Sequence, residues 1–500
     1  MKNKLFWLIA LGAWLLLAAI FLYTIVSGNT SFWYDPARDM LSAWNNLHKL
    51  TLIGSTSGIP GIFYGPYWIW LLSIPIFFSK DPRLTTLIVS FIPCMFILPI
   101  ILYQFKKYFD KWILLALWIL FILSSKSYVI FIWNPNNSPL LFLAATYLIL
   151  SAVSKEKFST GLKQIFLAGL LTGLALNINI AFGAVFALSS VLFLFLSTIL
   201  FLKRTLVIRT QQLFLRIGAF VIGILLMFLP FFIFEVRHGF EQTKIALMAL
   251  AHGGGGIVTV HGLTKVQIIG SFFGRWAQLL QLSSNAGLVI LAILIAILVI
   301  LFLQNKVHFS KAEGSLLLFL FSLSVGCLGL YLSVHNPVWE YHFTGIEVLW
   351  ILLLGVFLTK IPFIRYLVYV WILFLLCIQI MGFWGTIHTS ILTADSLTTK
   401  EYIVNTIVKD ANGKTYSVYA YSASIYVYEY TYLFRWLADK DVPYDPSAVK
   451  REGDVYLILS PEKQSLLDDF VNYRTPPKLY KTVKTFSIPN GTTILKRSLL

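Results

Sequence analysis

Long apolar stretches separated by short polar segments run along the first 386 residues. They cover about 5–27, 84–103, 112–125, 138–153, 163–180, 181–202, 217–234, 284–304, 314–333, 341–359 and 362–386. A helix needs roughly 20 mostly apolar residues to cross the hydrocarbon core of a bilayer, which is about 30 Å thick. The succession of eleven such stretches predicts a mainly α-helical, polytopic membrane protein.

The composition supports this prediction. Apolar and aromatic residues make up 58% of the 500-residue chain, charged residues only 12%, and the mean hydropathy is +0.78. Soluble globular proteins carry roughly 25% charged residues. A water-soluble enzyme, a disordered chain and a small disulfide scaffold are therefore excluded.

The net charge of +17 is concentrated on one side of the predicted bundle. With the N-terminus inside, the inner segments hold sixteen basic and three acidic residues, whereas the tail after residue 386 holds fourteen and twelve. An excess of Lys and Arg marks cytoplasmic loops. A nucleic-acid partner would need a basic, aromatic-rich soluble face, which the sequence lacks. The charge thus predicts a multi-pass protein of the cell membrane with a cytoplasmic N-terminus.

Three regions are expected on the outer side. In the first, residues 28–83, the apolar segment 67–78 is short and contains Pro75. About 12 residues cannot cross the membrane, so an interfacial helix is expected. The second region, 235–283, contains the flexible stretch Gly253 to Gly256. The third is the tail, 387–500.

The tail has soluble composition and predicts a small outward-facing α/β domain. The expected order is a strand over 416–421, an aromatic-rich helix over 425–439 and a second strand over 454–460. Ser460 and Pro461 predict the start of another helix, as N-cap and first helical residue. A hairpin follows over 480–497, turning at Pro489-Asn490-Gly491. The domains are therefore expected at 1–386 and 387–500.

The segment Trp33-Tyr34-Asp35-Pro36-Ala37-Arg38-Asp39 follows the first span directly. Asp35 before Pro36 has the pattern of a helix start, carboxylate at the N-cap and proline after it, with the helix reaching about Lys49. Asp39 then lies one turn beyond Asp35. Acids here can simply cap the helix and pair with a neighbour. At the outer membrane face, a carboxylate can also act as general base toward an acceptor hydroxyl.

Two further segments predict irregular structure beside the acids. Glycines and prolines in Gly54-Ser55-Thr56-Ser57-Gly58-Ile59-Pro60-Gly61, followed by Tyr64-Gly65-Pro66-Tyr67, indicate a loop that could merely connect elements along the bilayer. In Trp133-Asn134-Pro135-Asn136-Asn137-Ser138-Pro139, a cap before Pro139 explains part of the pattern. The amides could also hold a sugar or a phosphate.

Several cationic and titratable residues lie at a similar depth. Arg237, followed by His238, ends a span where an arginine can snorkel to the interface or bind a lipid-linked phosphate through its planar fork of donors. Lys126, Arg275 and His342 lie at the same level, while His252, His261 and His335 are too scattered for a metal site. Glu347 is expected inside a span, where an acidic residue is by default a candidate functional residue. No phosphate loop, nucleophile elbow or H-E-x-x-H motif occurs.

Taken in order, these segments resemble the GT-C superfamily of polyprenyl-phosphate-sugar-dependent glycosyltransferases. The resemblance is closest to the family-39 protein O-mannosyltransferase-like branch and its bacterial relatives, which include the lipid A aminoarabinose transferases. It rests on the Asp35–Asp39 segment, the loop from Gly54 to Tyr67, the Trp133–Asn136 segment and Phe234-Glu235-Val236-Arg237-His238-Gly239-Phe240. It covers most of residues 1–386.

The resemblance implies inverting transfer of a mannose-like hexose or an aminopentose from a polyprenyl-phosphate donor to a hydroxyl of a protein, lipid or glycan. Asp35 would match the catalytic aspartate, with Asp39 as its helper. The expected phosphate ligands are Arg237, His238, Lys126 and Arg275. Substrate contacts are expected from Tyr64, Tyr67, Trp133, Asn134, Asn136 and His342. The tail would have a possible role in binding the acceptor.

The chain departs from this pattern in two places. Many relatives have an Asp-Glu pair where this sequence has Asp35-Pro36, and an arginine common near the Trp-Asn-Pro segment is absent. No metal ligands are assigned, and a divalent ion is possible without support from spacing. Two alternatives remain open. A transporter or flippase of a lipid-linked glycan predicts charges deep in several spans and internal repeats, and a scaffold without catalysis is compatible with the composition.

Overall fold

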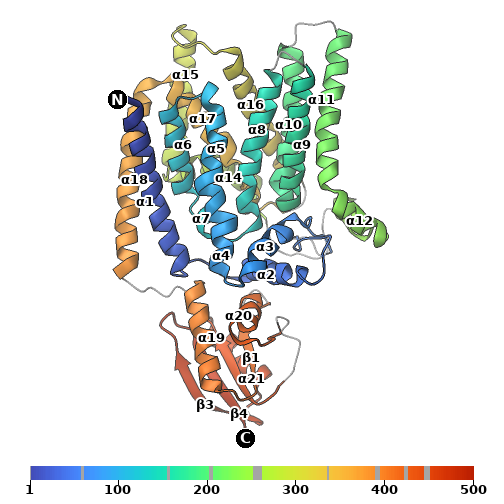
Figure 1. Ribbon diagram of the computed structural model, residues 1–500, viewed down its shortest axis with the longest axis vertical. Coiled ribbons are helices and arrows are strands. Elements are labelled where there is room, and N and C mark those ends of the chain that lie inside the picture. The colour runs from blue at the N-terminus through green and yellow to red at the C-terminus, as the bar shows by residue number, and fades with distance from the viewer. Residues whose placement is uncertain are drawn as a thin grey trace.

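The computed structural model describes residues 2–57, 61–154, 158–201, 206–251, 262–334, 337–388, 395–421, 426–443 and 451–500. They form a bundle of long helices and, below it in Figure 1, a small α/β unit at the C-terminus, residues 395–500. The N-terminus lies toward the opposite end of the bundle. The stretch Gly253 to Gly256, the loop residues Gly58 to Pro60, and His252, His261 and His335 lie outside the described residues.

The described residues contain nine helical segments long and apolar enough to cross a membrane. Seven are single helices and two are composite, Pro82–Lys107 and Asn134–Val153. The first composite runs through α4 (Pro82–Thr86), the π-helical turns Leu87–Phe91 and Pro93–Ile97, and α5 (Leu98–Tyr103), and the second ends in α8 (Ser138–Val153). The single helices are α1 (Lys2–Val26), α9 (Phe158–Ile178), α10 (Ile180–Phe201), α11 (Leu206–Met227), α15 (Ser284–Leu303), α16 (Lys311–Ser333) and α18 (Pro362–His388).

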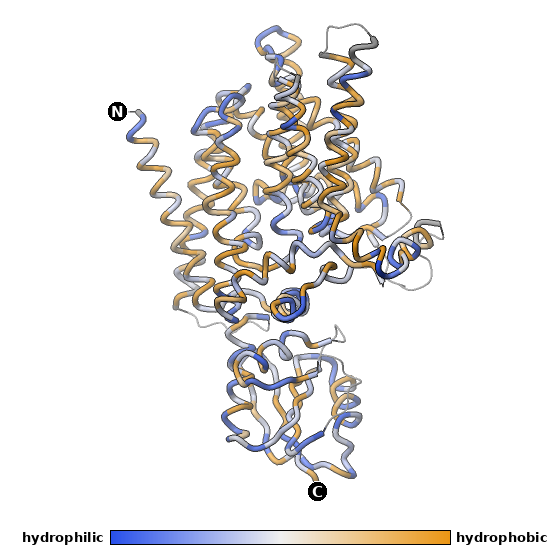
Figure 2. Tube along the Cα trace, turned by 45° about the vertical axis from the view of Figure 1, so that its right-hand side comes forward, coloured by the Kyte–Doolittle hydropathy of each residue, from blue (hydrophilic) through white to orange (hydrophobic). Residues whose placement is uncertain are grey.

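Two shorter helices, α6 (Lys111–Ser124) and α17 (Glu347–Lys360), occupy the other predicted spans. Both are almost entirely buried between their neighbours, while the outer helices expose large apolar side chains such as Leu225, Phe321 and Leu373. Figure 2 colours much of the trace of the bundle helices as hydrophobic. A buried centre with an apolar exterior suits hydrocarbon as the surrounding solvent. The prediction of a multi-pass membrane protein is confirmed.

Two predicted span boundaries are wrong. The stretch 217–234 is divided between α11 and α12 (Leu229–Arg237), with Pro230 at the start of α12. Proline lacks the amide hydrogen that would continue the earlier helix. The stretch 341–359 begins with a 3-10 turn, Glu340–Phe343, and α17 starts only at Glu347. Glu347 therefore lies at the first residue of this helix and not inside a span.

The first outer region folds into α2 (Tyr34–Asn46) and α3 (Tyr67–Phe78) at the end of the bundle that faces the C-terminal unit (Figure 1). The short apolar helix expected at 67–78 is confirmed. The predicted N-cap is wrong: Trp33, in extended conformation, precedes α2, and Asp35 lies within the first turn. Its carboxylate pairs with Arg38 three residues later and so is directed along the helix.

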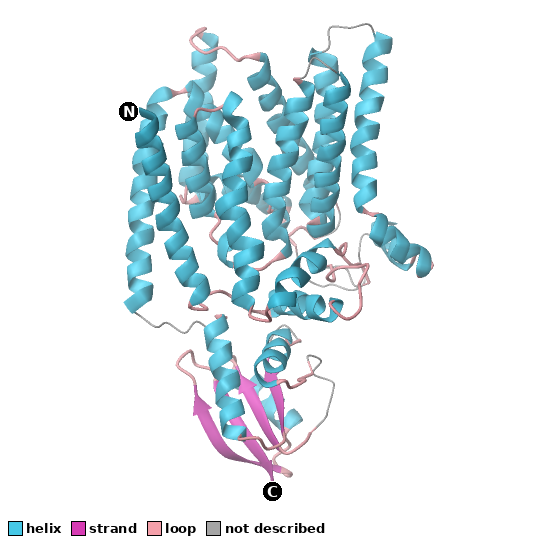
Figure 3. Cartoon of the chain, viewed as in Figure 1, coloured by secondary structure: helices cyan, strands magenta, loops and turns pink. Residues whose placement is uncertain are grey.

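The C-terminal unit is a four-stranded sheet with helices packed against it (Figure 3). The strand order is β1-β2-β4-β3, with β1 parallel to β2 and the other pairs antiparallel. The strands are β1 (Tyr416–Tyr421), β2 (Asp454–Leu459), β3 (Tyr480–Ser487) and β4 (Thr493–Leu499), and the helices are α19 (Leu397–Ala411), α20 (Tyr428–Ala438) and α21 (Gln464–Arg474).

The expected strands and hairpin of the tail are confirmed, and Gly491 supplies the positive φ of +87° in the hairpin turn. The predicted aromatic helix is α20, which begins at Tyr428. The helix start at Ser460 is wrong. The chain remains irregular through Pro461, and α21 begins at Gln464 with Lys463 as its N-cap residue.

The C-terminal unit is fixed to the first outer region by ion pairs and buried rings. Arg83 donates to both carboxylate oxygens of Glu401, at 2.6 Å each. The hydroxyl of Tyr432 donates to the carbonyl of Lys80 at 2.6 Å, and its ring packs edge-on against Phe32 and Trp44. Both regions therefore lie on the same side of the bundle.

Candidate active site

Asp39 of α2 is a buried, fully engaged carboxylate. Only 1% of its side chain is exposed. Its Oδ1 accepts from the hydroxyl of Ser55 at 2.6 Å and from Arg38, and its Oδ2 accepts from the indole of Trp68 at 2.9 Å. Charge-assisted hydrogen bonds of this kind fix both partners. Asp39 thus holds Arg38, α3 and the loop around Ser55 in one arrangement.

Asp35 lies on the other side of the same arginine. Arg38 reaches its Oδ1 at 2.9 Å, and 20% of the Asp35 side chain is exposed. Burial raises the pKa of Asp35, Arg38 lowers it, and the nearby charge of Asp39 raises it. The balance keeps the pKa of Asp35 above that of an ordinary aspartate. A raised pKa makes a carboxylate a stronger base toward a hydroxyl.

Aromatic side chains from three separate segments interact with Asp35. Trp133 donates a side-chain hydrogen bond to it, and the Trp133 ring lies edge-on to Tyr341 at 5.7 Å. Tyr64 is close enough to interact electrostatically with Asp35 and Asp39, and burial raises the pKa of its hydroxyl to about 12. Burial likewise raises the pKa of Tyr341, with Tyr64 and Asp35 contributing.

The loop that carries Tyr64 is closed by short backbone contacts. The amide of Gly65 donates to the carbonyl of Asn177 at 3.2 Å, and a Cβ at Gly65 would collide with the Asn177 side chain. The amide of Gly54 donates to the carbonyl of Tyr64 at 2.7 Å. Only glycine permits an approach this close. The Gly-rich loop therefore positions Tyr64, whereas Tyr67 lies in the first turn of α3 against Trp70.

A cavity of about 340 Å³ lies beyond Trp133 and Tyr341. Asn136, Arg275 and Gln278 also line it. Arg275 belongs to α14 (Lys265–Leu279), which starts at a Thr264–Gln267 capping box and buries Phe272 and Trp276 in the bundle. The guanidinium donates to Oε1 of Gln278 at 3.0 Å and to the carbonyl of Glu340 at 2.8 Å. The cationic Arg275 and Trp133, the partner of Asp35, thus line the same cavity.

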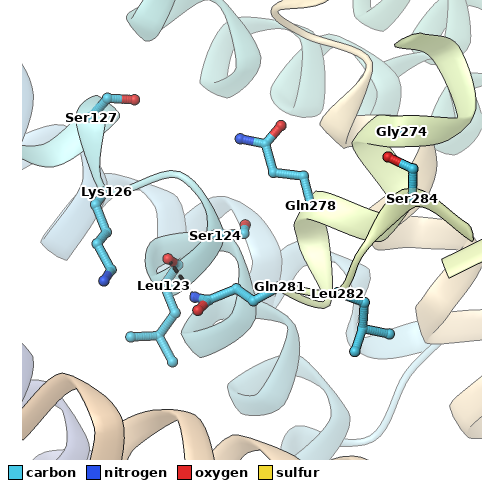
Figure 4. A pocket seen from close by; sticks show the side chains of 9 residues that line it. All are labelled: Leu123, Ser124, Lys126, Ser127, Gly274, Gln278, Gln281, Leu282 and Ser284. Atoms are coloured by element: carbon cyan, nitrogen blue, oxygen red, sulfur yellow. Dashed lines mark hydrogen bonds between the residues drawn. The ribbon is translucent and has the colours of Figure 1, made fainter. Parts of the chain in front are cut away.

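A larger cavity of about 510 Å³ adjoins the first and shares Ser127 and Gln278 with it. Figure 4 shows Gln278 extending from α14 toward the middle of this space, with Lys126 on the opposite wall. Gln281, in a left-handed conformation with φ of 53°, donates to the carbonyl of Leu123 at 2.7 Å and closes one side. Lys126 forms no ion pair with any described residue.

Three expected substrate contacts form hydrogen bonds within the protein. The amide of Asn134 donates to the carbonyl of Ile178 at 2.7 Å and joins its segment to the end of α9. Asn136 donates to the carbonyl of Ser127 at 3.2 Å while facing the smaller cavity. His342 lies behind Tyr341, its Nδ1 accepting from the amide of Trp339 at 3.3 Å. Burial lowers the pKa of His342 to about 4, which keeps it neutral at physiological pH.

Arg237 and His238 lie apart from this group. Arg237 ends α12, which projects from the side of the bundle in Figure 1, and His238 follows it; both side chains are exposed. The Nδ1 of His238 contacts the carbonyl of Phe234 at 2.8 Å, and its ring stacks on Phe234. Neither residue lines either cavity. Of the four expected phosphate ligands, Lys126 and Arg275 line the two adjoining cavities, one residue in each.

Sequence reasoning missed Arg38, Gln278 and Tyr341 as site residues. Arg38 stands inside the quoted acidic segment, and Tyr341 precedes His342, so both had a visible signal. Gln278 had none, because it belongs to no motif. Among the residues that the structure describes, no group of three or more His, Cys, Asp or Glu residues could hold a metal ion.

No protein-family model matches this sequence, and a search of curated proteins gives no match. Solved structures do match. ArnT from Cupriavidus metallidurans in the apo state matches over 99% of this chain and 97% of its own, with a TM-score of 0.60 and 10% identity. ArnT bound to undecaprenyl phosphate matches over 99% and 98%, with a TM-score of 0.59 and 10% identity. The Archaeoglobus fulgidus oligosaccharyltransferase in complex with Zn and sulfate matches over 97% and 72%, with a TM-score of 0.48 and 14% identity.

The chain is thus a multi-pass membrane protein that shares the fold of ArnT. The likeness to ArnT extends over nearly the whole of both chains and includes the small C-terminal sheet. The fold that the ordered motifs implied is confirmed.

Proposed function

We propose that this protein is a membrane glycosyltransferase that moves a sugar from a polyprenyl-phosphate donor to an acceptor hydroxyl at the outer membrane face. The donor sugar would be a mannose-like hexose or an aminopentose. One observation carries the proposal. Asp35 is a partly exposed carboxylate of raised pKa that accepts a hydrogen bond from Trp133. Trp133 and Arg275 both line the smaller cavity.

The chemistry follows from this arrangement. The acceptor oxygen attacks the anomeric carbon while the Asp35 carboxylate takes the hydroxyl proton. The bond between that carbon and the phosphate oxygen breaks, and polyprenyl phosphate leaves with an additional negative charge. We infer that Arg275 and Lys126, which line the adjoining cavities, stabilise this charge. Preorganised electrostatic stabilisation often contributes several kcal/mol. Attack opposite the leaving group inverts the configuration at the anomeric carbon.

Asp35 suits the role of base better than Asp39 does. Both oxygens of Asp39 already accept hydrogen bonds, and its side chain is 1% exposed. Asp39 instead keeps Arg38 in place. The cavity-lining Arg275 has a planar fork of five donors, of which two are used within the described residues. We infer that donors without a hydrogen-bond partner among the described residues bind the phosphate oxygens.

The orientation of the protein belongs to the same proposal. Lysines and arginines favour the cytoplasmic side, which puts the N-terminus inside and α2, α3 and the C-terminal unit outside the cell membrane. Tyr34 lies edge-on to Tyr428 of this unit at 5.1 Å. The unit, 387–500 with its linker, therefore adjoins the base and is suited to bind the acceptor, be it protein, lipid or glycan. ArnT, which shares the fold, has been crystallised with undecaprenyl phosphate.

The test uses full-length protein in proteoliposomes with mannosyl and aminoarabinosyl polyprenyl phosphates and acceptors of the three classes. Release of polyprenyl phosphate is common to all acceptors and is the readout. We expect Asp35→Asn to reduce release by two to four orders of magnitude, the range typical of a lost general base. Asp81→Asn is the matched control, because Asp81 caps α4 on the same face and pairs with Arg83.

Unchanged release by Asp35→Asn would remove Asp35 from the chemistry. A wild type that releases nothing but moves the lipid-linked sugar across the bilayer would favour the transporter instead.

A further inference from the structure

Glu347 is a buried carboxylate to which the proposed reaction assigns no part. Its side chain is 6% exposed at the start of α17. The hydroxyl of Tyr128 donates to Oε1 at 2.9 Å, and the amide of Gly345 donates to Oε2 at 2.6 Å. Burying an ionised carboxylate is unfavourable unless it is paired and hydrogen-bonded. These bonds fix the position of its two oxygens.

Among the described residues, Arg275 forms an ion pair with this carboxylate. Its Nη1 lies 3.7 Å from Oε1 of Glu347, an ion pair longer than a direct hydrogen bond. The same Nη1 donates to Gln278. The guanidinium thus pairs with Glu347 and also belongs to a residue that lines the cavity.

The segment between Glu340 and Glu347 connects the carboxylate to a second contact of the arginine. The carbonyl of Glu340 accepts from Nη2 of Arg275, and Tyr341 and Thr344 of this segment line the cavity. Gly345 has a φ of +124°, and a Cβ there would collide with the ring of Phe182. Only glycine suits this position. The turn that presents its amide to Glu347 is therefore closely constrained.

We propose that Glu347 is a positioning residue, which keeps the guanidinium of Arg275 directed at the phosphate of a lipid-linked donor. This proposal rests on the proposed function. It adds Glu347 as the residue that orients the phosphate ligand Arg275. Tyr128 and Gly345 hold Glu347, Glu347 and the Glu340 carbonyl hold Arg275, and Arg275 binds the phosphate. Glu347 itself does not touch the ligand.

Charge repulsion and positioning predict opposite effects of Glu347 on phosphate binding, so the proposal can be tested. A carboxylate near a phosphate site repels the phosphate, so its removal by charge alone would strengthen binding. Positioning predicts weaker binding. Glu347→Gln suits the test because glutamine retains an acceptor oxygen for Tyr128 or Gly345 and nearly the same volume, while the ion pair with Arg275 is lost.

The experiment measures binding of polyprenyl phosphate, without sugar, to purified full-length protein in detergent. We expect Glu347→Gln to weaken binding about tenfold and to raise the KM for the donor without changing that for the acceptor. Glu313→Gln is the control, since Glu313 pairs with Lys360 at 2.6 Å away from both cavities. Glutamine also preserves its capping box.

A double-mutant cycle separates positioning from general stability. In an Arg275→Lys background, Glu347→Gln should have less than a twofold effect, because its action passes through the guanidinium. Equal losses in both backgrounds, or unchanged or tighter binding by Glu347→Gln alone, would overturn the proposal. A wild type that does not bind polyprenyl phosphate would instead contradict the proposed function.

Discussion

On the α2 side of the site, Arg38 lies between two carboxylates, with Asp39 buried and Asp35 partly exposed. On the α14 side, Arg275 has a single carboxylate at 3.7 Å and faces a cavity. Both regions combine arginine with acid. In the first, the arginine is enclosed and an acid is left accessible. In the second, the acid is enclosed and the arginine is left accessible.

Under the proposed function, this difference gives the same residue types opposite roles. The arginine held by two acids orients the proposed base, whereas the arginine that lines the cavity binds the proposed phosphate. In the proposed reaction the α2 side acts on the acceptor hydroxyl and the α14 side acts on the donor phosphate. Variants on one side should therefore leave the step on the other side unchanged.

The largest loss of stability is expected from Arg38→Gln. Asp39 would remain buried without its cation, and removing one partner of a buried pair costs about 3 kcal/mol or more. We expect a lower Tm and loss of transfer together. The control is Arg435→Gln. It removes a hydrogen bond from Arg435 of α20 to Asn45 of α2 but leaves no buried charge. An unchanged Tm for Arg38→Gln would show that Asp39 does not depend on this arginine.

Acidification should affect only the α2 side. The base acts as a carboxylate, and burial raises the pKa of Asp35 above the ordinary value of roughly 3.9. As pH falls through that raised pKa, protonated Asp35 accumulates and transfer should decline about tenfold per pH unit. Donor binding should stay constant, because the proposed phosphate ligands belong to the other side of the site. Parallel loss of binding and transfer would contradict the separation of roles.

A moderate effect is expected at the contact between α2 and the C-terminal unit. Tyr428→Ala removes a ring that packs against Tyr34, beside Asp35. We expect a several-fold rise in the KM for the acceptor and no change in that for the donor. Tyr473→Ala, a substitution of an exposed ring on α21, is the control. A change in donor KM would show that the contact acts on the cavity instead.

The smallest effect is expected from Arg237→Ala. Its exposed side chain lies on α12, outside both cavities, so donor binding should change less than twofold. Binding of polyprenyl phosphate to this variant and to Arg275→Ala gives the comparison. Losses of equal size would place a phosphate ligand on α12 and contradict the assignment to α14.

The sequence predicted the bundle because apolar stretches of membrane length are unambiguous, and it drew attention to Asp35 because acids are rare at the membrane face. It could not assign Asp39, whose partners Ser55 and Trp68 are 16 and 29 residues away. Nor could it pair Arg275 with Glu347 across two helices. Arg237 was an expected phosphate ligand because it ends a span, but the direction of that end depends on the break before Pro230.

The most direct measurement compares donor binding and sugar transfer in the same preparations of wild type, Asp35→Asn and Arg275→Ala. Asp35→Asn should bind the donor as wild type does and transfer almost none of it. Arg275→Ala should lose binding at least tenfold. If Asp35→Asn loses donor binding as severely as Arg275→Ala, the two arginine–acid groups do not have separate roles and the account is wrong.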